Sequence, residues 1–264
     1  MNSYGNTSKF KIFLNKYLYI FKRIVNNFRR QQLLDYNKKN IIILCDNLIE
    51  LDVRKNSCSK EPETIMWLES FKGKKIIFWD IGANIGAYSL VAASLNYKVL
   101  SFEPAFQNYF KLNQNITANK MDSLVKAFCI SFGKKKLLGN FNIYSLSEGS
   151  AKGNFNSDNY FALKLKLLTN KTTPVFTVDE FIKIFNLEVP NLIKIDVDGG
   201  ELDILEGSIN TLKNHKLKSL LVEFDTRNKK FKQFELLINK SGFKISNIYD
   251  REKYVKNYIL KRIK

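Results

Sequence analysis

A glycine-containing turn at residues 80–89, with the sequence DIGANIGAYS, has the residue types of a ligand-binding loop. It lies between a strand-like apolar run and a helix-like segment. Gly82 and Gly86 allow a tight turn and a close approach of the backbone to a ligand, and the first amides of the following helix are free to donate. The spacing D-x-G-x-N-x-G differs from the G-x-G-x-x-G fingerprint of nicotinamide dehydrogenases, so the pattern disfavours that class of enzyme.

Two carboxylates accompany this turn. Asp80 ends the strand before it, and an acid at that point favours a ligand with positive charge over a pyrophosphate. The ammonium and sulfonium groups of S-adenosylmethionine meet this requirement. Glu103 ends the next strand, where a carboxylate can accept hydrogen bonds from both ribose hydroxyls. The sequence therefore predicts a cofactor site formed by Asp80, Gly82, Asn84, Gly86 and Glu103.

A third set of acids follows a later strand, in IKIDVDGGELD at residues 193–203. The ligand crevice of an open parallel sheet lies beyond the carboxyl ends of its strands, so Asp196 and Asp198 are expected to meet the first two acids there, together with Glu223. We predict Asp196 and Glu223 as catalytic carboxylates, with Asp196 also close to the cofactor. Glu201 and Asp203 fit equally well as first-turn acids that interact with a helix dipole.

The chain has a single histidine, His215, and three cysteines, Cys45, Cys58 and Cys129. Their irregular spacing forms neither a disulfide framework nor a zinc-ligand pattern, so no metal is expected. His215 precedes a strand and therefore lies at the edge of the sheet opposite the crevice, which predicts a structural or solvent-facing role.

Strand-like and helix-like segments alternate from residue 61 onward. A helix is expected at 61–71 and another at about 231–241, ended by Gly242 and followed by a strand. Buried strands are expected at 75–80, 98–102, 125–130, 192–196 and 220–224. This alternation predicts an α/β fold with a doubly wound, mostly parallel sheet. The last segment, 251–264, fits an edge strand or a membrane-facing tail, and the sequence does not decide between them.

The N-terminal segment 9–30 has the strongest helical periodicity in the chain. Its apolar residues, many of them aromatic, share one arc of a helix, and its polar arc is almost purely cationic. Such a helix suits the surface of an anionic bilayer, but it could equally pack on its own domain. Residues 41–53 are expected to form a small hairpin. We therefore divide the chain into an N-terminal helix and linker, 1–40, and a main domain, 41–264.

The formal net charge of +18 is concentrated at the two ends of the chain. Residues 1–40 carry +8 and residues 226–264 carry +9, whereas the long middle part carries only +1. A nucleic-acid partner is therefore disfavoured, because the expected catalytic body is almost neutral. No apolar run reaches the roughly 20 residues that a membrane span requires, and no secretion signal is evident. We expect a cytoplasmic protein, with membrane contact through residues 9–30 as one option.

Several of these motifs together resemble the FkbM-type S-adenosylmethionine-dependent methyltransferases. The resemblance covers residues 61–225 and includes the glycine turn, IKIDVDGGE with the later Leu205-Glu206-Gly207, LLVEF, and FEP followed by Asn108, Leu112 and Asn115. It implies the class I methyltransferase fold, with about seven strands of which the last is antiparallel. The sequence departs from the family pattern at Asp198, which replaces a glutamate, and at Phe132, which replaces an acid.

The resemblance also implies a function. It indicates O-methylation of a hydroxyl on a sugar, a glycan or a related natural product, lipid-linked acceptors included, with residues 133–174 as the likeliest determinant of specificity. An RNA methyltransferase is the alternative, but the strand before Asp196 lacks the Asn/Asp-Pro-Pro-aromatic turn that grips a flipped base. A non-catalytic basic module with the same fold, acting at a membrane surface, is the second alternative.

Overall fold

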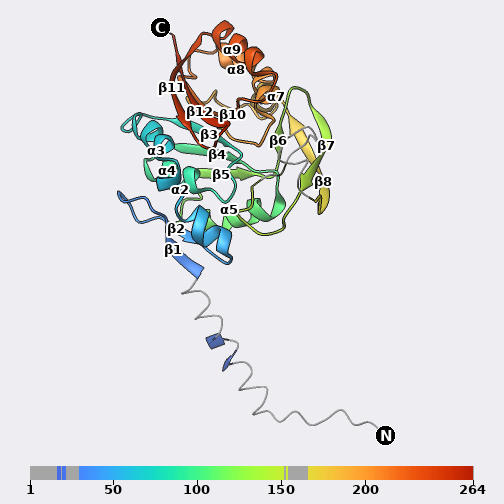
Figure 1. Cartoon of the computed structure of the whole chain (residues 1–264). Coiled ribbons are helices and arrows are strands. Elements are labelled where there is room, and N and C mark those ends of the chain that lie inside the picture. Colours follow the sequence, from blue (N-terminus) through green and yellow to red (C-terminus); the bar gives the residue numbers. More distant parts are fainter. Residues whose placement is uncertain (1–16, 19, 22–29, 152, 154–165, 264) are drawn as a thin grey trace.

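The computed structural model describes residues 17, 18, 20, 21, 30–151, 153 and 166–263. A seven-stranded sheet runs through the main body, with helices on both of its faces (Figure 1). The doubly wound α/β fold expected from the alternating segments is therefore confirmed.

The order of the central sheet is β11-β12-β10-β9-β3-β4-β5. Strands β10, β9, β3, β4 and β5 pair in parallel, whereas β12 is antiparallel to both of its neighbours. The expectation of a mostly parallel sheet whose last strand is antiparallel is confirmed. The strands are β3 Ile77–Ile81, β4 Lys98–Phe102, β5 Val125–Phe128, β9 Leu192–Ile195, β10 Ser219–Asp225, β11 Phe243–Asp250 and β12 Val255–Arg262.

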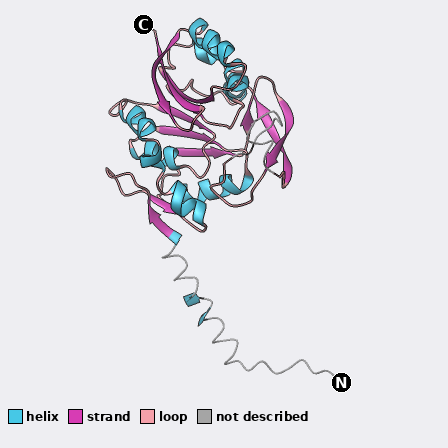
Figure 2. Ribbon diagram, in the orientation of Figure 1, coloured by secondary structure: helices cyan, strands magenta, loops and turns pink. Residues whose placement is uncertain are grey.

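Helices cover both faces of this sheet, as the ribbon in Figure 2 shows. One face carries the segments before β5: η1 Glu50–Arg54, α2 Ser57–Lys60, α3 Pro62–Glu69, α4 Ala87–Ser94 and α5 Phe106–Ala118. The other face carries the later helices: α6 Val178–Ile184, α7 Glu201–Glu206, α8 Ile209–Lys213 and α9 Phe231–Lys240. Pro62 begins α3, as expected, because its missing N–H is not needed at a first helical position.

The core consists of two apolar layers, one on each side of the sheet. Successive strand residues point to opposite faces, so Phe78 packs in the layer under α3 and α4 while Trp79 packs under α6. Both side chains are fully buried. Strand β3 is therefore apolar on both faces, as its continuous hydrophobic run predicts for a central parallel strand.

The hairpin expected at 41–53 is wrong in its boundaries. Strand β2, Ile42–Leu44, pairs with β1, Gln31–Leu33, and not with residues further along the chain. Residues 50–54 instead form the short π-helix η1. The expected linker also includes core residues, because Leu34 and Tyr36 are buried. The proposed division of the chain at residue 40 stays a prediction.

The C-terminal segment is neither an edge strand nor a tail. Residues 255–262 form β12, which inserts between β10 and β11 and hydrogen-bonds to both. Its side chains Tyr258, Ile259 and Leu260 are buried. The sequence could not show this insertion, because strand order depends on which edges pair and not on local pattern.

Residues 133–174 contain part of a separate three-stranded sheet. Its strands are β6 Ser131–Phe132, β7 Leu137–Ile143 and β8 Thr169–Phe176, in the order β6-β8-β7. The irregular strand-like runs expected in this region are thus partly regular strands. Residues 152 and 154–165 of this region lie outside the described residues.

The predicted N-terminal helix lies mostly outside the described residues. Of its apolar arc, Tyr17, Leu18, Ile20 and Phe21 are described, are helical and are exposed. Within the described ranges, no helix has the length and apolarity needed to cross a membrane.

The fully buried side chain of Asn115 links three segments of the fold. Its Oδ1 accepts from the Leu44 backbone N–H at 2.9 Å, and its Nδ2 donates to the Ile85 carbonyl at 2.9 Å. One amide on α5 therefore satisfies backbone groups of both β2 and the glycine turn. Loss of the amide would leave those groups buried without partners.

We expect Asn115→Ala to lower the free energy of unfolding by about 2 kcal/mol or more, because two buried backbone groups lose their hydrogen bonds. Urea denaturation measures this change. Asn113→Ala is the matched control, since that half-buried amide donates only to a carbonyl of its own helix and its loss should cost less than about 0.5 kcal/mol. Equal losses of unfolding free energy in the two variants would contradict the structural role given to the Asn115 amide.

Candidate functional site

The predicted site residues come together at the carboxyl ends of the parallel strands. Asp80 lies in β3, Glu103 follows β4, Asp196 follows β9 and Glu223 lies near the end of β10. Because β3, β4, β9 and β10 are parallel neighbours, these ends share one edge of the sheet. The convergence expected from the sequence is therefore seen in the fold.

The glycine turn packs tightly against β9. Gly82 has a φ of +86°, and a Cβ built there would lie 1.8 Å from the carbonyl oxygen of Asp196. Gly86 has a φ of +93°, and a Cβ there would lie 2.4 Å from a methyl carbon of Leu112. Both positions thus require glycine for conformation and for space. At Gly82 the close neighbour is the strand that carries a predicted catalytic residue.

Asp80 is buried with one oxygen unpartnered. Its Oδ2 accepts from the Ser89 hydroxyl at 2.6 Å, whereas Oδ1 has no hydrogen-bond partner among the described residues. Burial raises the pKa of Asp80, an effect that Lys194 opposes. A buried carboxylate oxygen with no partner is costly unless a ligand completes it, so this atom fits a donor or a cation.

Both carboxylate oxygens of Glu103 accept backbone hydrogen bonds. Oε2 accepts from the N–H of Asn84 at 2.8 Å, and Oε1 accepts from the N–H of Ala105 at 2.9 Å. This geometry joins the glycine turn to the start of α5 and fixes the orientation of the carboxylate. Burial raises the pKa of Glu103 to about 7. Each oxygen keeps a second lone pair, which is what two ribose hydroxyls require.

The side chain of Asn84 reaches the region expected to set specificity. Its Nδ2 donates to the Ser150 carbonyl at 2.9 Å, and Nδ2 of Asn108 donates to the same carbonyl at 2.9 Å. The adjacent Gly149 donates its N–H to Asn108 Oδ1, while Arg54 Nε donates to the Gly149 carbonyl at 2.7 Å. The loop between β7 and β8 therefore lies against the glycine turn, a contact that local sequence patterns do not reveal.

Asp196 and Glu223 form an asymmetric pair of carboxyl groups. Lys194 Nζ lies 2.6 Å from Asp196 Oδ2. Burial alone would raise the pKa of Asp196, but Lys194 and a hydrogen bond from Glu223 hold it below its usual value. Burial and the neighbouring Asp196 charge raise the pKa of Glu223 to about 10. Near neutral pH, Asp196 is therefore ionised and Glu223 carries a proton.

Charged residues that the sequence interpretation missed surround this pair. Arg251, in the turn between β11 and β12, places Nη2 at 2.9 Å from Glu61 Oε1 and Nε at 3.8 Å from Glu223 Oε2. Glu63 Oε1 lies 3.9 Å from Nη1 of this arginine and accepts from Asn257 Nδ2 at 2.8 Å. The contacts with Glu61 and Glu63 join segments 190 and 194 residues apart, so no local motif could indicate them.

The other acids of the IDVDGGE segment have local roles. Glu201 Oε1 accepts from the Gly199 backbone N–H at 2.8 Å, within the turn that begins α7. Asp203 lies 3.8 Å from Lys134 in a partly exposed ion pair. Glu201 and Asp203 are thus better described as acids in the first turn of α7 than as ligand contacts. Asp198 has a φ of +56° and stays a predicted crevice residue.

Two other expectations concern residues away from the crevice. His215 is exposed in the turn before β10, at the opposite edge of the sheet, as predicted. Phe132, which replaces the usual acid, is buried between Phe102, at 4.7 Å between ring centroids, and Trp79, at 5.9 Å. It therefore belongs to the apolar core.

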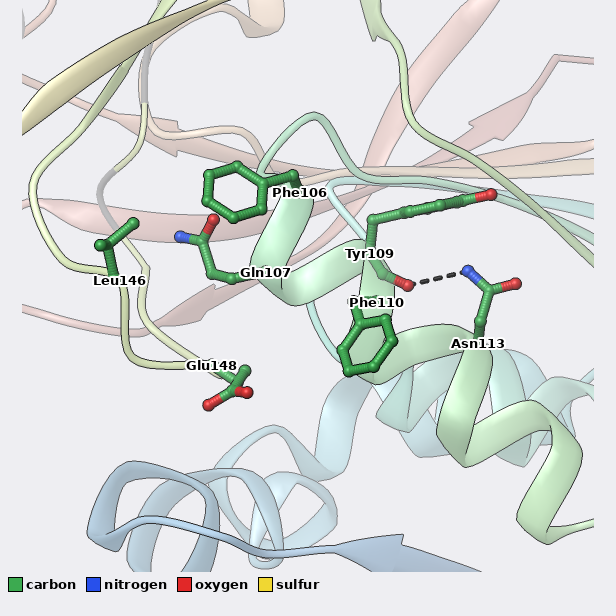
Figure 3. A pocket seen from close by; sticks show the side chains of 7 residues that line it. All are labelled: Phe106, Gln107, Tyr109, Phe110, Asn113, Leu146 and Glu148. Carbon is green, nitrogen blue, oxygen red and sulfur yellow. Dashed lines mark hydrogen bonds between the residues drawn. The ribbon is translucent and has the colours of Figure 1, made fainter. Parts of the chain in front are cut away.

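A groove of about 680 Å³ opens along the exposed face of α5 (Figure 3). Its lining includes three aromatic side chains and comes from α5 and the loop that contains Ser150. None of the predicted site residues lines it. The lining residues are Phe106, Gln107, Tyr109, Phe110, Asn113, Leu146 and Glu148.

We expect Gly82→Ala to lower the free energy of unfolding by about 3 kcal/mol or more, because backbone strain adds to a clash with Asp196. Gly73→Ala is the matched control. Gly73 has a similar φ of +81° but no atom within 4 Å of the added Cβ, so only the strain of about 1–2 kcal/mol remains. Thermal or urea denaturation measures both, and equal losses would show that the contact with β9 is unimportant.

Comparison with known proteins shows which family the chain resembles. Residues 80–245 match the family described as Methyltransferase FkbM domain. The hexuronic acid methyltransferase AglP of Haloferax volcanii is 25% identical over 138 residues, which is 52% of this chain and 52% of that protein. This chain therefore spans about half the length of that relative.

Solved structures of methyltransferases also resemble the chain. A methyltransferase FkbM from Methylobacillus flagellatus KT has 17% identity and a TM-score of 0.46, covering 70% of this chain and 43% of that one. A SAM-dependent methyltransferase from Agrobacterium tumefaciens has 10% identity and a TM-score of 0.47, covering 78% and 62%. Because the family match includes more than half of its residues, the chain belongs to the FkbM methyltransferase domain family.

Proposed function

We propose that the chain is an S-adenosylmethionine-dependent O-methyltransferase that acts on a hydroxyl of a sugar, a glycan or a related natural product, lipid-linked acceptors included. The observation that carries the proposal is the convergence of Asp80, Glu103, Asp196 and Glu223 at one edge of the sheet. Asp80 has a buried oxygen with no partner among the described residues, and Lys194 Nζ lies 2.6 Å from Asp196 Oδ2. Membership of the FkbM family supports the same reaction.

The residues present fit S-adenosylmethionine. Asp80 Oδ1 is a buried acceptor that lacks a partner, as a cationic cofactor requires. Glu103 is fixed by two backbone amides and keeps lone pairs for ribose hydroxyls. Gly82, Asn84 and Gly86 shape the turn that would lie along the cofactor. When bound, S-adenosylmethionine supplies an electrophilic methyl group attached to a positively charged sulfur.

Asp196 has the properties of the base in this reaction. A hydroxyl is a poor nucleophile while it keeps its proton, so a base must accept that proton as the oxygen–methyl bond forms. Asp196 is ionised and its side chain is 26% exposed, so it can reach a ligand in the crevice. Glu223 carries a proton and can donate a hydrogen bond to another acceptor oxygen.

A sugar hydroxyl is the acceptor class that we favour. The relative from Haloferax volcanii is named a hexuronic acid methyltransferase, which supports a sugar acceptor for this chain too. The loop around Gly149 and Ser150 contacts Asn84 and Asn108 next to the predicted cofactor site. Variation of this loop would therefore change the acceptor without changing the cofactor residues.

We expect Asp196→Asn to lower kcat about 100-fold or more while the affinity for S-adenosylhomocysteine changes little, because only the base is lost. Transfer of tritiated methyl groups into glycan and RNA pools measures turnover, and calorimetry measures affinity. Asp203→Asn, in the partly exposed pair with Lys134, is the matched control and should keep full activity. Labelled RNA in place of labelled glycan would overturn the proposal, and so would the absence of any cofactor binding.

We further propose that residues 9–30 hold the enzyme at an anionic membrane, on its cytoplasmic face. The four described residues of the apolar arc are exposed by 41% to 65%. This exposure supports membrane contact over the alternative of packing on the domain. Cationic residues on the opposite arc would be attracted to anionic lipid headgroups.

We expect deletion of residues 1–29 to abolish co-sedimentation with anionic vesicles. The deletion ends before Arg30, because Arg30 pairs with Asp46 and β1 follows it directly. Phe21→Ser should weaken binding, whereas Met66→Ser, at an exposed apolar position on α3, should not. Vesicle binding by the truncated chain equal to that of the full chain would contradict the proposal.

A further inference from the structure

A row of charged side chains lies on one face of the sheet beneath the crevice. Strand β9 alternates between apolar and charged residues, so Lys194 and Asp196 point to one face and Ile193 and Ile195 to the other. In the register of β3 with β9, Asp80 is the direct neighbour of Lys194. Lys194 is therefore placed between the unpartnered acid of the cofactor site and the predicted base.

Lys194 is one of the most deeply buried charged residues of the described chain. Its side chain is 1% exposed, its Nζ lies 2.6 Å from Asp196 Oδ2, and the same nitrogen lies 4.9 Å from the centroid of the Tyr88 ring. A buried ammonium is stable only beside compensating negative charge. Burial alone would lower the pKa of Lys194, but Asp196, Glu61 and Asp80 raise it, so the ammonium stays charged.

The position of the Lys194 ammonium explains why Asp196 and Glu223 differ in protonation. The ion pair of Lys194 is with Asp196, whereas the cation nearest to Glu223 is Arg251, whose Nε is 3.8 Å away and whose guanidinium also contacts Glu61. Two adjacent carboxyl groups cannot both ionise at low cost. The negative charge therefore resides on Asp196 and the proton on Glu223.

Other charged groups also face Asp196 and must be considered in any pH profile. Two come from the elements packed over the crevice, namely Arg54 on η1 and Tyr88 on α4. Asp198 and Glu201 face the carboxyl pair from the loop after β9 and the start of α7.

We propose that Lys194 is a positioning residue of the methyl-transfer site, whose ammonium holds Asp196 fixed and ionised at the edge of the crevice while Glu223 keeps the proton of the pair. The inference rests on the proposed function, in which Asp196 accepts the proton of the acceptor hydroxyl. Lys194 itself neither binds the acceptor nor accepts a proton. It acts only through the carboxylate two residues further along the same strand.

Lys194→Met tests the proposal through the pH dependence of kcat. Without the ammonium, Asp196 binds its proton more tightly, so the acid limb of the profile should move up by about one pH unit or more. On the acid limb itself, a shift of one unit should lower kcat about tenfold at a given pH, and kcat should recover as the pH is raised. Lys194→Arg keeps the positive charge and should keep the acid limb of the unmodified enzyme.

Lys111→Met is the matched control for loss of a buried lysine. Lys111 is 0% exposed, lies 3.2 Å from Glu50 Oε1 and also pairs with Asp46, away from the carboxyl pair. Its loss should reduce stability without moving the acid limb. A shift of equal size in Lys111→Met, or no shift in Lys194→Met, would overturn the proposal.

Two further measurements keep the test decisive. If Lys194→Met does not fold, Lys194→Gln replaces it in the pH profile. An upward shift of the acid limb in Lys194→Arg would also contradict the proposal, because that variant keeps the positive charge. Titration of ¹³C-labelled carboxyl groups by NMR, with Asp196→Asn to assign the signal, follows Asp196 without any acceptor. A raised midpoint for Asp196 in the Lys194 variant supports the inference even if glycan methylation is not found, and an unchanged midpoint refutes it.

Discussion

The contact between Gly82 and the carbonyl of Asp196 sets the distance between the two halves of the site. A side chain at Gly82 would overlap that carbonyl, so the turn after β3 can approach β9 only without a Cβ. The approach also places the backbone of Asn84 within reach of Glu103. Close packing of two strand ends therefore brings the predicted cofactor residues and the predicted catalytic residue to one edge of the sheet.

Burial of charge is the second constraint, because the crevice contains more carboxylates than cations. Lys194 and Arg251 each offset several acids and are almost fully buried themselves. Protonation of Glu223 relieves part of this surplus, whereas the incompletely paired carboxylate of Asp80 leaves part of it uncompensated. A cationic cofactor would supply the missing positive charge, so the electrostatic state of the free protein is suited to the ligand we propose.

The two basic ends of the chain have different physical roles. In the C-terminal part, Arg262 donates to the carbonyls of Leu217 and Asn214 and lies over the Phe243 ring at 4.4 Å. Arg262 thus belongs to β12, a strand of the central sheet. The N-terminal excess accompanies apolar residues that are exposed where they are described. The proposed membrane contact therefore rests on the N-terminal segment, where charge and exposed apolar residues occur together.

Local sequence determined the elements and most of the predicted site. Apolar runs ending in acids identified β3, β4 and β9, because a central parallel strand is buried on both faces and ligands bind beyond its carboxyl end. The glycine spacing located the turn, and the predicted site acids Asp80, Glu103 and Asp196 lie at the carboxyl ends of these strands.

Tertiary structure alone decided the contacts between distant segments. It paired β2 with β1, inserted β12 between β10 and β11, and brought Arg251 to Glu61 and Glu223. It also made Lys194 part of the site, although the alternation of β9 already placed that residue on the same face as Asp196. Strand order, burial and ion pairing depend on which surfaces meet, and short-range periodicity contains no information about that choice.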